Sequence, residues 1–223
     1  MEFWSAEQLR KEFDVIASFY QIEVGSILYQ CRSHAVIFRK GYNNQGFPDA
    51  IVCMANPGGA RPEDSSYQLP IIQNHFDKVA YVMSKDDSTI RQLQRLMQKM
   101  NWNVISIINL SDLISDNMED FQVKLKQVEQ YSFKKHSIFD DTRLLEREAL
   151  LDCNSNYTKI ILAWGKDSSI NQLACVAIGI LSKKEKHLFG LKYSSQKWDY
   201  AHPFPRKKQR CIEWLKKMSL QLS

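Results

Sequence analysis

Apolar residues along the chain gather in short continuous runs that are bounded by turn residues. Residues 50–55 form the clearest run, and it ends at Asn56-Pro57-Gly58-Gly59. Residues 103–110, 159–163 and 187–191 form three further runs. Runs of this length predict strands, and the first of them is apolar throughout, which is typical of a strand buried on both faces.

Segments with apolar residues at helical spacing separate these runs. Residues 5–20 place Leu9, Phe13, Ile16 and Tyr20 on one face behind Ser5, a suitable N-cap, and so predict an opening amphipathic helix. Residues 24–31 and 34–40 are separated by Arg32-Ser33 and predict a hairpin-like pair or an edge strand with its extension. Further helices are expected over 86–100, 170–181 and 207–220, with two more inside 117–150 that are joined by a loop near 131–140.

Strands that alternate with helices predict an α/β fold with right-handed crossovers. We expect a three-layer α/β/α sandwich around a central, mainly parallel four-stranded sheet. Residues 1–223 are expected to form a single domain, to which residues 1–49 add an N-terminal helix and edge strands as an appendage. In such sheets, ligands bind at the carboxyl ends of the strands, where the Asn-Pro-Gly-Gly turn lies.

Composition narrows the class of protein. The chain of 223 residues is 44% hydrophobic, which suits one well-packed domain. No basic segment followed by an apolar stretch opens the chain, and no run of about eighteen apolar residues occurs, so a cytoplasmic protein without membrane contact is expected. The five cysteines are scattered singly, which predicts free buried thiols and neither a metal site nor an iron–sulfur cluster.

The net charge of +5 is unevenly distributed. Residues 183–223 contain eleven Lys or Arg against three Asp or Glu, a net charge of +8, so the rest of the chain carries −3. Such a segment suits a polyanionic partner that is bound through phosphate contacts. A solvated lysine-rich surface is the alternative interpretation.

Four segments of this chain resemble, in order, the motifs of the uracil-DNA glycosylase superfamily: Met54–Gly59, Ser106–Asn109, Leu162–Gly165 and Ala201–Arg206. The first is similar to the Asn-Pro-Gly form of the mismatch-specific and single-strand-selective branches. The resemblance implies a monofunctional DNA glycosylase that flips a base out of DNA and hydrolyses its N-glycosidic bond without a cofactor. It also implies a monomer with DNA as its partner and a place in DNA repair or antiviral defence.

The resemblance assigns roles to individual residues. Asn56 would hold the attacking water, and His202 would donate a hydrogen bond to the base as negative charge develops on it. Asn109 would read the base edge, with Pro57, Gly58 and Tyr67 completing the base-binding set. DNA contacts would come from Gly59, Trp164, Gly165, Lys166, Ser168, Pro203, Phe204, Pro205, Arg206, Lys207 and Lys208. Asn56 as an ordinary turn residue, Asn109 as a capping residue and His202 as a loop histidine remain alternatives.

Two departures from the superfamily pattern bear on the substrate. Gly58 stands where the uracil-specific branch has a tyrosine that excludes substituents at the pyrimidine C5 atom, so a 5-substituted or hypermodified pyrimidine, such as those of phage DNA, is the expected base. Phe204 replaces the serine that bonds a phosphate and could stack between bases instead.

A second resemblance is to a bacterial and phage family of unknown function. It rests on Asn56-Pro57, the segment 87–91, Asn109-Leu110, Ala163-Trp164-Gly165 and His202-Pro203. Fold alone does not fix activity, so two other function classes stay open. One is a non-catalytic DNA-binding or damage-recognition module, and the other is an enzyme that acts on free nucleotides.

Overall fold

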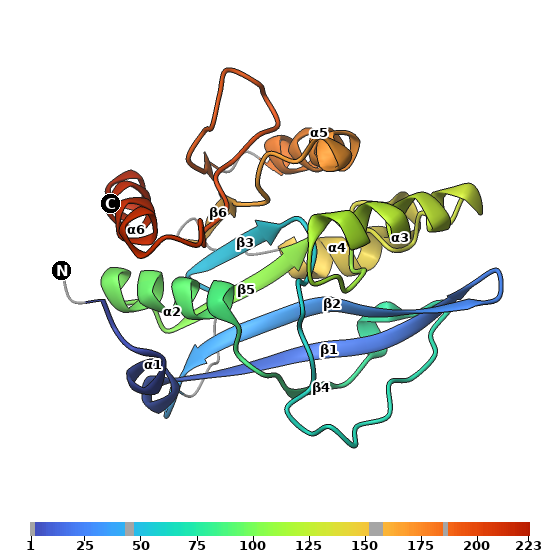
Figure 1. The fold of residues 1–223 in the computed structure, drawn as a ribbon, viewed down its shortest axis with the longest axis horizontal. Coiled ribbons are helices and arrows are strands. Elements are labelled where there is room, and N and C mark those ends of the chain that lie inside the picture. Colours follow the sequence, from blue (N-terminus) through green and yellow to red (C-terminus); the bar gives the residue numbers. More distant parts are fainter. Residues whose placement is uncertain (1–2, 43–46, 152–157, 185–186) are drawn as a thin grey trace.

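A computed structural model describes residues 3–42, 47–151, 158–184 and 187–223 of the chain. Its centre is a seven-stranded sheet with the strand order β4-β1-β2-β5-β3-β6-β7 (Figure 1). The strands are β1 (Phe13–Val24), β2 (Ile27–Arg39), β3 (Ala50–Met54), β4 (Tyr81–Met83), β5 (Val104–Asn109), β6 (Lys159–Leu162) and β7 (Leu188–Phe189).

The sheet is mixed and has two halves. Strands β5, β3, β6 and β7 run parallel to one another, whereas β4, β1 and β2 are joined by antiparallel pairings and β2 meets β5 antiparallel. The predicted α/β class is confirmed. The prediction of a mainly parallel four-stranded sheet was incomplete, because it describes the parallel half alone.

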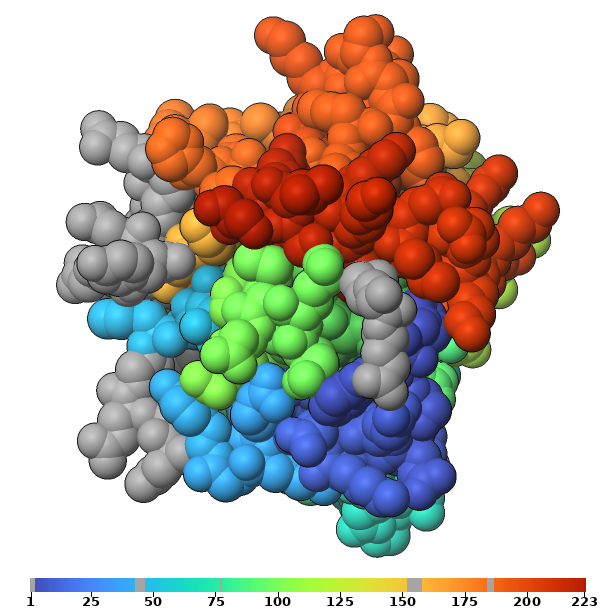
Figure 2. Space-filling model, turned by 90° about the vertical axis from the view of Figure 1, so that its left-hand side faces the viewer, coloured from blue at the N-terminus to red at the C-terminus, as the bar shows by residue number. Residues whose placement is uncertain are grey.

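Helices cover both faces of this sheet. Leu9 of α1 and buried side chains of α2 and α6 pack in one apolar core, while buried side chains of α3, α4 and α5 pack in the other. Figure 2 shows α6, α2 and α1 next to one another on one side of the molecule. The helices are α1 (Ala6–Glu12), α2 (Ser88–Met100), α3 (Met118–Gln130), α4 (Leu144–Leu151), α5 (Asn171–Leu181) and α6 (Lys208–Leu222). Short 3-10 helices are η1 (Phe76–Lys78), η2 (Asp141–Arg143), η3 (Ser168–Ile170) and η4 (Ser182–Lys184).

The predicted helix over residues 5–20 was wrong beyond its first two turns. The capping box of Ser5 and Gln8 begins α1, but the helix ends at Glu12 and the chain continues as β1. The apolar residues of β1 alternate, although they shift from odd to even positions after Phe19, because the first half faces one core and the second half faces the other. This shift breaks the two-residue period and imitates helical spacing.

The break at Arg32-Ser33 is a β-bulge and not a turn. Ala17 pairs with Ala35 while Phe19 pairs with Arg32, so β2 contains one residue more than β1 at this point. The two predicted segments are therefore one strand of 13 residues. Because β2 pairs with both β1 and β5, it lies inside the sheet, and the N-terminal strands are not an appendage at its edge.

The remaining predicted elements agree with the structure within a few residues. These are the strands at 50–55, 103–110, 159–163 and 187–191, the helices at 86–100, 170–181 and 207–220, and the two helices inside 117–150. Cys31, Cys53 and Cys211 are free and buried as expected, whereas Cys175 is exposed and Cys153 lies outside the described residues. In the part of the chain that the structure describes, no helix is long and apolar enough to cross a bilayer.

Candidate functional site

A small cavity of about 60 Å³ lies where β3 ends, beside the N-terminus of α2. Its position at the carboxyl end of a parallel strand is the one that open α/β sheets use for ligands. The cavity is lined by Arg32, Met54, Asn56, Pro57, Gly58, Asp87, Thr89, Ile90, Leu93, Ile107 and His202. The first and last sequence motifs, about 145 residues apart, therefore meet at one place.

The Asn-Pro-Gly turn presents the Asn56 side chain to this cavity. Gly58 has a φ of 62°, a left-handed conformation that favours glycine. Its N–H donates to Asn56 Oδ1 at 3.1 Å, which fixes the orientation of the amide. The amide nitrogen Nδ2 is then a buried donor that has no acceptor in the described structure. Asn56 therefore lines the cavity, as predicted, and also stabilises the turn, which was the alternative interpretation of this residue.

His202 enters the cavity as a neutral hydrogen-bond donor. The backbone N–H of Phe204 donates to its Nδ1 at 3.2 Å, and the Phe204 carbonyl lies 3.4 Å from the same nitrogen. In the neutral tautomer that accepts the shorter of these two contacts, the ring proton lies on Nε2. Burial lowers the pKa of His202 below its ordinary value, while the nearby Phe204 backbone and Asp87 act in the opposite direction. In this arrangement the Nε2–H group is the donor that can form a hydrogen bond to a ligand.

The Trp-Gly segment positions the loop that contains His202. Gly165 and Tyr200 exchange two backbone hydrogen bonds of 2.8 and 3.1 Å, and the Ala201 N–H donates to the Leu191 carbonyl. The indole N–H of Trp164 donates to the Trp198 carbonyl at 2.6 Å, and its ring meets Tyr200 edge to face at 5.4 Å. Trp164 is only 2% exposed, so the prediction of a direct DNA contact by this side chain is wrong.

Asn109 supports the cavity from behind and does not line it. It is fully buried at the end of β5. In the amide orientation that satisfies both neighbours, its nitrogen donates to the Asn56 carbonyl at 3.1 Å and its oxygen accepts from Arg32 Nη2 at 3.3 Å. These contacts occupy the donor and the acceptor that were predicted to read a base edge. The placement indicates a positioning role that connects the Asn56 turn to β2.

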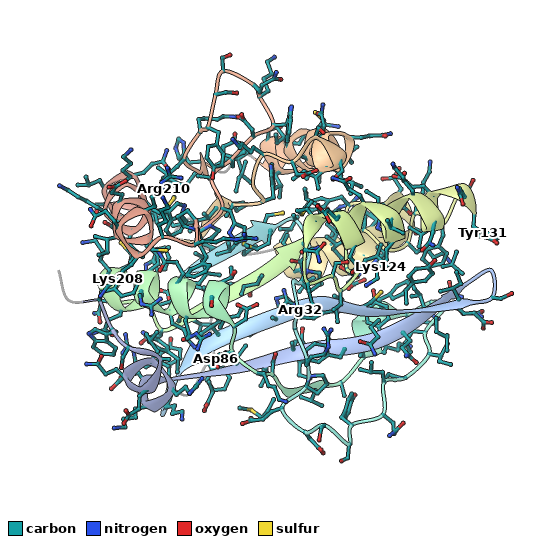
Figure 3. All side chains as sticks on the ribbon, viewed as in Figure 1. Arg32, Asp86, Lys124, Tyr131, Lys208 and Arg210 are labelled. Atoms are coloured by element: carbon teal, nitrogen blue, oxygen red, sulfur yellow. The ribbon has the colours of Figure 1, made fainter. Side chains whose placement is uncertain are left out.

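Sequence reasoning missed two charged residues of the cavity, Arg32 and Asp87. Arg32 comes from β2, and Figure 3 places it in the middle of the molecule, away from Lys208 and Arg210 at the end near α6. Its one sequence signal was a charge between two apolar segments, which were interpreted as a hairpin-like pair or as an edge strand with its extension. Asp87 is the N-cap of α2, where Oδ1 accepts from the N–H groups of Thr89 and Ile90 at 2.7 Å each. It lies in the segment that carried the second family resemblance.

The guanidinium of Arg32 is buried without a charged partner in contact. The residue is 3% exposed, and Nε has no acceptor among the described residues. Desolvation lowers the pKa of Arg32 to about 10, although Asp87 and Asp112 attract its charge from a distance. No carboxylate of the described chain lies within 4.0 Å of it, in contrast to Arg143, which pairs with Asp112 and Glu146.

The other predicted site residues lie around the cavity or outside it. Pro57 and Gly58 line it as predicted, whereas Tyr67 belongs to a separate cavity of about 260 Å³ under the loop after Gly59. Pro203 is buried, and Phe204, Pro205 and Gly165 are half-buried. The remaining candidates are exposed: Gly59, Lys166, Ser168, Arg206, Lys207 and Lys208. Within the described ranges, no three His, Cys, Asp or Glu side chains converge as a metal site.

The fold and cavity define an α/β protein with a polar site at the carboxyl end of its parallel strands. A family model described as "Protein of unknown function (DUF1643)" matches residues 78–204, and the chain belongs to this family. The matched segment contains Asp87, Asn109, Trp164 and His202, while Arg32 and Asn56 lie before it.

No curated protein matches the chain. Among solved structures, a feruloyl esterase module from Clostridium thermocellum, a mutant in complex with sinapinate, shares 10% identity with a TM-score of 0.33. That match covers 94% of this chain and 63% of the module, so this chain spans less than two thirds of that protein's length.

Proposed function

We propose that this protein is a monofunctional DNA glycosylase that hydrolyses the N-glycosidic bond of a modified pyrimidine. The observation that carries the proposal is the meeting of Asn56 and His202 in one cavity, with the Nε2–H of a neutral histidine free to bind a ligand. A neutral donor that is fixed before the reaction stabilises negative charge on a departing base without a prior proton transfer.

The proposed chemistry uses three side chains of the cavity. The oxygen of a water molecule forms a bond to C1′ of the sugar as the C1′–N bond breaks, and the electron pair leaves with the base. His202 donates to the base oxygen on which this charge develops. Asp87 is the group that can accept the proton of the water, because an amide such as Asn56 is not a base at neutral pH. Asn56 then orients water or base through its unpartnered Nδ2.

The cavity is too small for a pyrimidine ring unless it widens. Its volume of about 60 Å³ is smaller than the roughly 150 Å³ of a cavity that binds benzene. A pyrimidine ring therefore enters after the mouth between the Asn56 turn and the His202 loop widens. Exposed Arg206, Lys207 and Lys208 directly follow this loop, where they can contact the phosphates on either side of a flipped nucleotide.

The test is base release from a panel of single-stranded and duplex DNAs that contain uracil, thymine mismatches, 5-hydroxymethyl pyrimidines or glucosylated cytosine. We expect the release of one class of base, at least 100-fold reduced in His202→Ala, since one preorganised donor contributes about 10²–10³ in rate. Asp87→Asn keeps a good N-cap but removes the base, so it separates catalysis from the stability of α2. His75→Ala changes an exposed loop histidine and serves as the matched control.

The two other function classes give different results in the same assay. A non-catalytic module binds DNA tightly and releases no base from any substrate. An enzyme for free nucleotides acts on mononucleotides with a weak dependence on salt, whereas phosphate tracking along DNA gives a steep one. Base release that is equal in the wild type and His202→Ala would refute the proposed role of the cavity.

A further inference from the structure

The cavity contains more hydrogen-bond donors than its own residues can satisfy. Arg32 Nε and Asn56 Nδ2 are buried donors with no acceptor in the described structure, and His202 Nε2–H has its ring partner on the opposite nitrogen. All three residues line the same cavity. Buried donors are normally paired, so two such groups beside the His202 imidazole around one space indicate a missing acceptor.

The charged residues of the cavity indicate that the missing acceptor is negatively charged. The guanidinium of Arg32 is buried, and within the described part of the chain its side-chain partner is the neutral amide of Asn109 at 3.3 Å. A buried cation without a contacting anion is strongly unfavourable, and an anionic ligand removes that penalty. The N-terminus of α2, a helix of 13 residues, adds positive potential at the same wall.

Asp87 is the acidic residue of the wall, and its charge is already partly compensated. Its Oδ1 accepts two backbone N–H groups of α2 at 2.7 Å each. The carboxylate is therefore held at the positive end of the helix and leaves the Arg32 donors free.

We propose that the cavity is a binding site for an oxyanion, a ligand oxygen that carries negative charge and accepts hydrogen bonds from Arg32, Asn56 and His202. This inference does not depend on base release, because it concerns binding alone. A carboxylate or the anionic oxygen of a ring is one source of such an oxygen, and a phosphate group is the other. The volume of about 60 Å³ suits a small group of this kind.

The test compares acetate with acetamide, two probes of the same shape that differ in charge. Thermal unfolding and calorimetric titration of the full chain are measured at constant ionic strength, with inorganic phosphate as the second anion. We expect acetate or phosphate to bind saturably and to raise the melting temperature, while acetamide binds at least tenfold more weakly. Tighter binding of phosphate identifies a phosphate group as the source, and tighter binding of acetate identifies a planar oxyanion.

Variants assign the effect to Arg32. Arg32→Met is expected to weaken anion binding at least tenfold. It should change the melting temperature of the free protein little, because removal of a buried charge that has no contacting anion offsets the loss of the hydrogen bond to Asn109. Arg61→Met is the matched control, because the side chain of Arg61 is 44% exposed and lies outside this cavity. Arg32→Lys keeps the positive charge but loses the planar set of guanidinium N–H donors, so weaker but detectable anion binding is expected.

Two outcomes would overturn the proposal. Equal binding of acetate and acetamide shows that the cavity does not select charge, and unchanged anion binding in Arg32→Met shows that the anion binds elsewhere. If Arg32→Met does not fold, the Arg32 Nε–H resonance of the wild-type protein provides the readout, and it must shift on addition of acetate. Anion binding without base release would refute the proposed glycosylase and leave the anion site intact. Base release without anion binding would support the glycosylase and refute the anion site.

Discussion

Protonation of two buried histidines is expected to destabilise the protein in mild acid. His34 of β2 is 6% exposed and its Nδ1 contacts the Tyr81 hydroxyl, while His136 is 3% exposed and its Nδ1 contacts Ser111 Oγ at 2.9 Å. Burial lowers the pKa of each to about 4, and the positive charges of Arg32 and Arg143 act in the same direction. Both histidines are therefore neutral in the folded protein at pH 5.

The sign of the effect follows from proton uptake in the two states. With an unfolded pKa of 6.5 and a folded pKa of about 4, the unfolded chain binds more protons between these values. Stability is complete above pH 6.5 and falls as the pH decreases toward 4. At pH 5 each histidine lowers the free energy of unfolding by about 2 kcal/mol relative to pH 7.5, so the pair lowers it by about 4 kcal/mol.

Urea denaturation at pH 7.5, 6.5, 5.5 and 5.0 measures this loss directly. His34→Gln and His136→Gln should each remove about 2 kcal/mol of the change in the free energy of unfolding between pH 7.5 and 5.0, and the double variant should remove about 4 kcal/mol of it. His75→Gln, at an exposed loop position, should leave it intact. Equal stability of the wild-type protein at pH 7.5 and 5.0, or full pH dependence in both buried variants, would contradict protonation of these two histidines on unfolding.

Three further predictions concern the supports of the site. Gly190→Ala should lower the free energy of unfolding by about 1–3 kcal/mol, because its Cβ would lie 2.5 Å from the Tyr200 ring and 2.7 Å from the Leu162 carbonyl. Gly179→Ala lies inside α5, where the added Cβ meets no atom of another segment within 4 Å, and it should be neutral or stabilising in the same urea titration. Trp164→Phe should lower the free energy of unfolding by about 1–3 kcal/mol, since the Trp198 carbonyl loses its donor. Unchanged stability would contradict the supporting role of this hydrogen bond. Asn109→Leu leaves two partners unsatisfied, the Asn56 carbonyl and Arg32, and should lower the free energy of unfolding by about 1–3 kcal/mol for each. A loss of ligand binding without a loss of stability would instead favour direct contact between Asn109 and the base.

The sequence predicted the contents of the cavity better than its supports. Asn56 and His202 were identified because their segments resemble two motifs of the uracil-DNA glycosylase superfamily, and both residues line the cavity. Trp164 and Asn109 belong to equally clear motifs, yet both are buried and hold other parts of the site. A motif shows that a residue type is used at a position but does not distinguish contact with a ligand from support of a neighbour.

Tyr67 was wrongly placed in the cavity, and Arg32 was missed. Tyr67 was chosen by its distance along the chain from Asn56, but the loop between them leads it into a different cavity. Arg32 was taken as part of the break between two segments, which were interpreted as a hairpin-like pair or as an edge strand with its extension. A bulge keeps the strand continuous and directs this side chain into the protein.

The sequence by itself determined the α/β class, the parallel strands that end at the site, and the helices between them, because each depends on a local pattern of apolar residues and turn residues. Tertiary structure alone decided the antiparallel half of the sheet, the bulge in β2, and the approach of Arg32 and Asp87 to Asn56 and His202. These features depend on strand pairings between distant segments, and the identity of the residues along any one segment does not specify its partner.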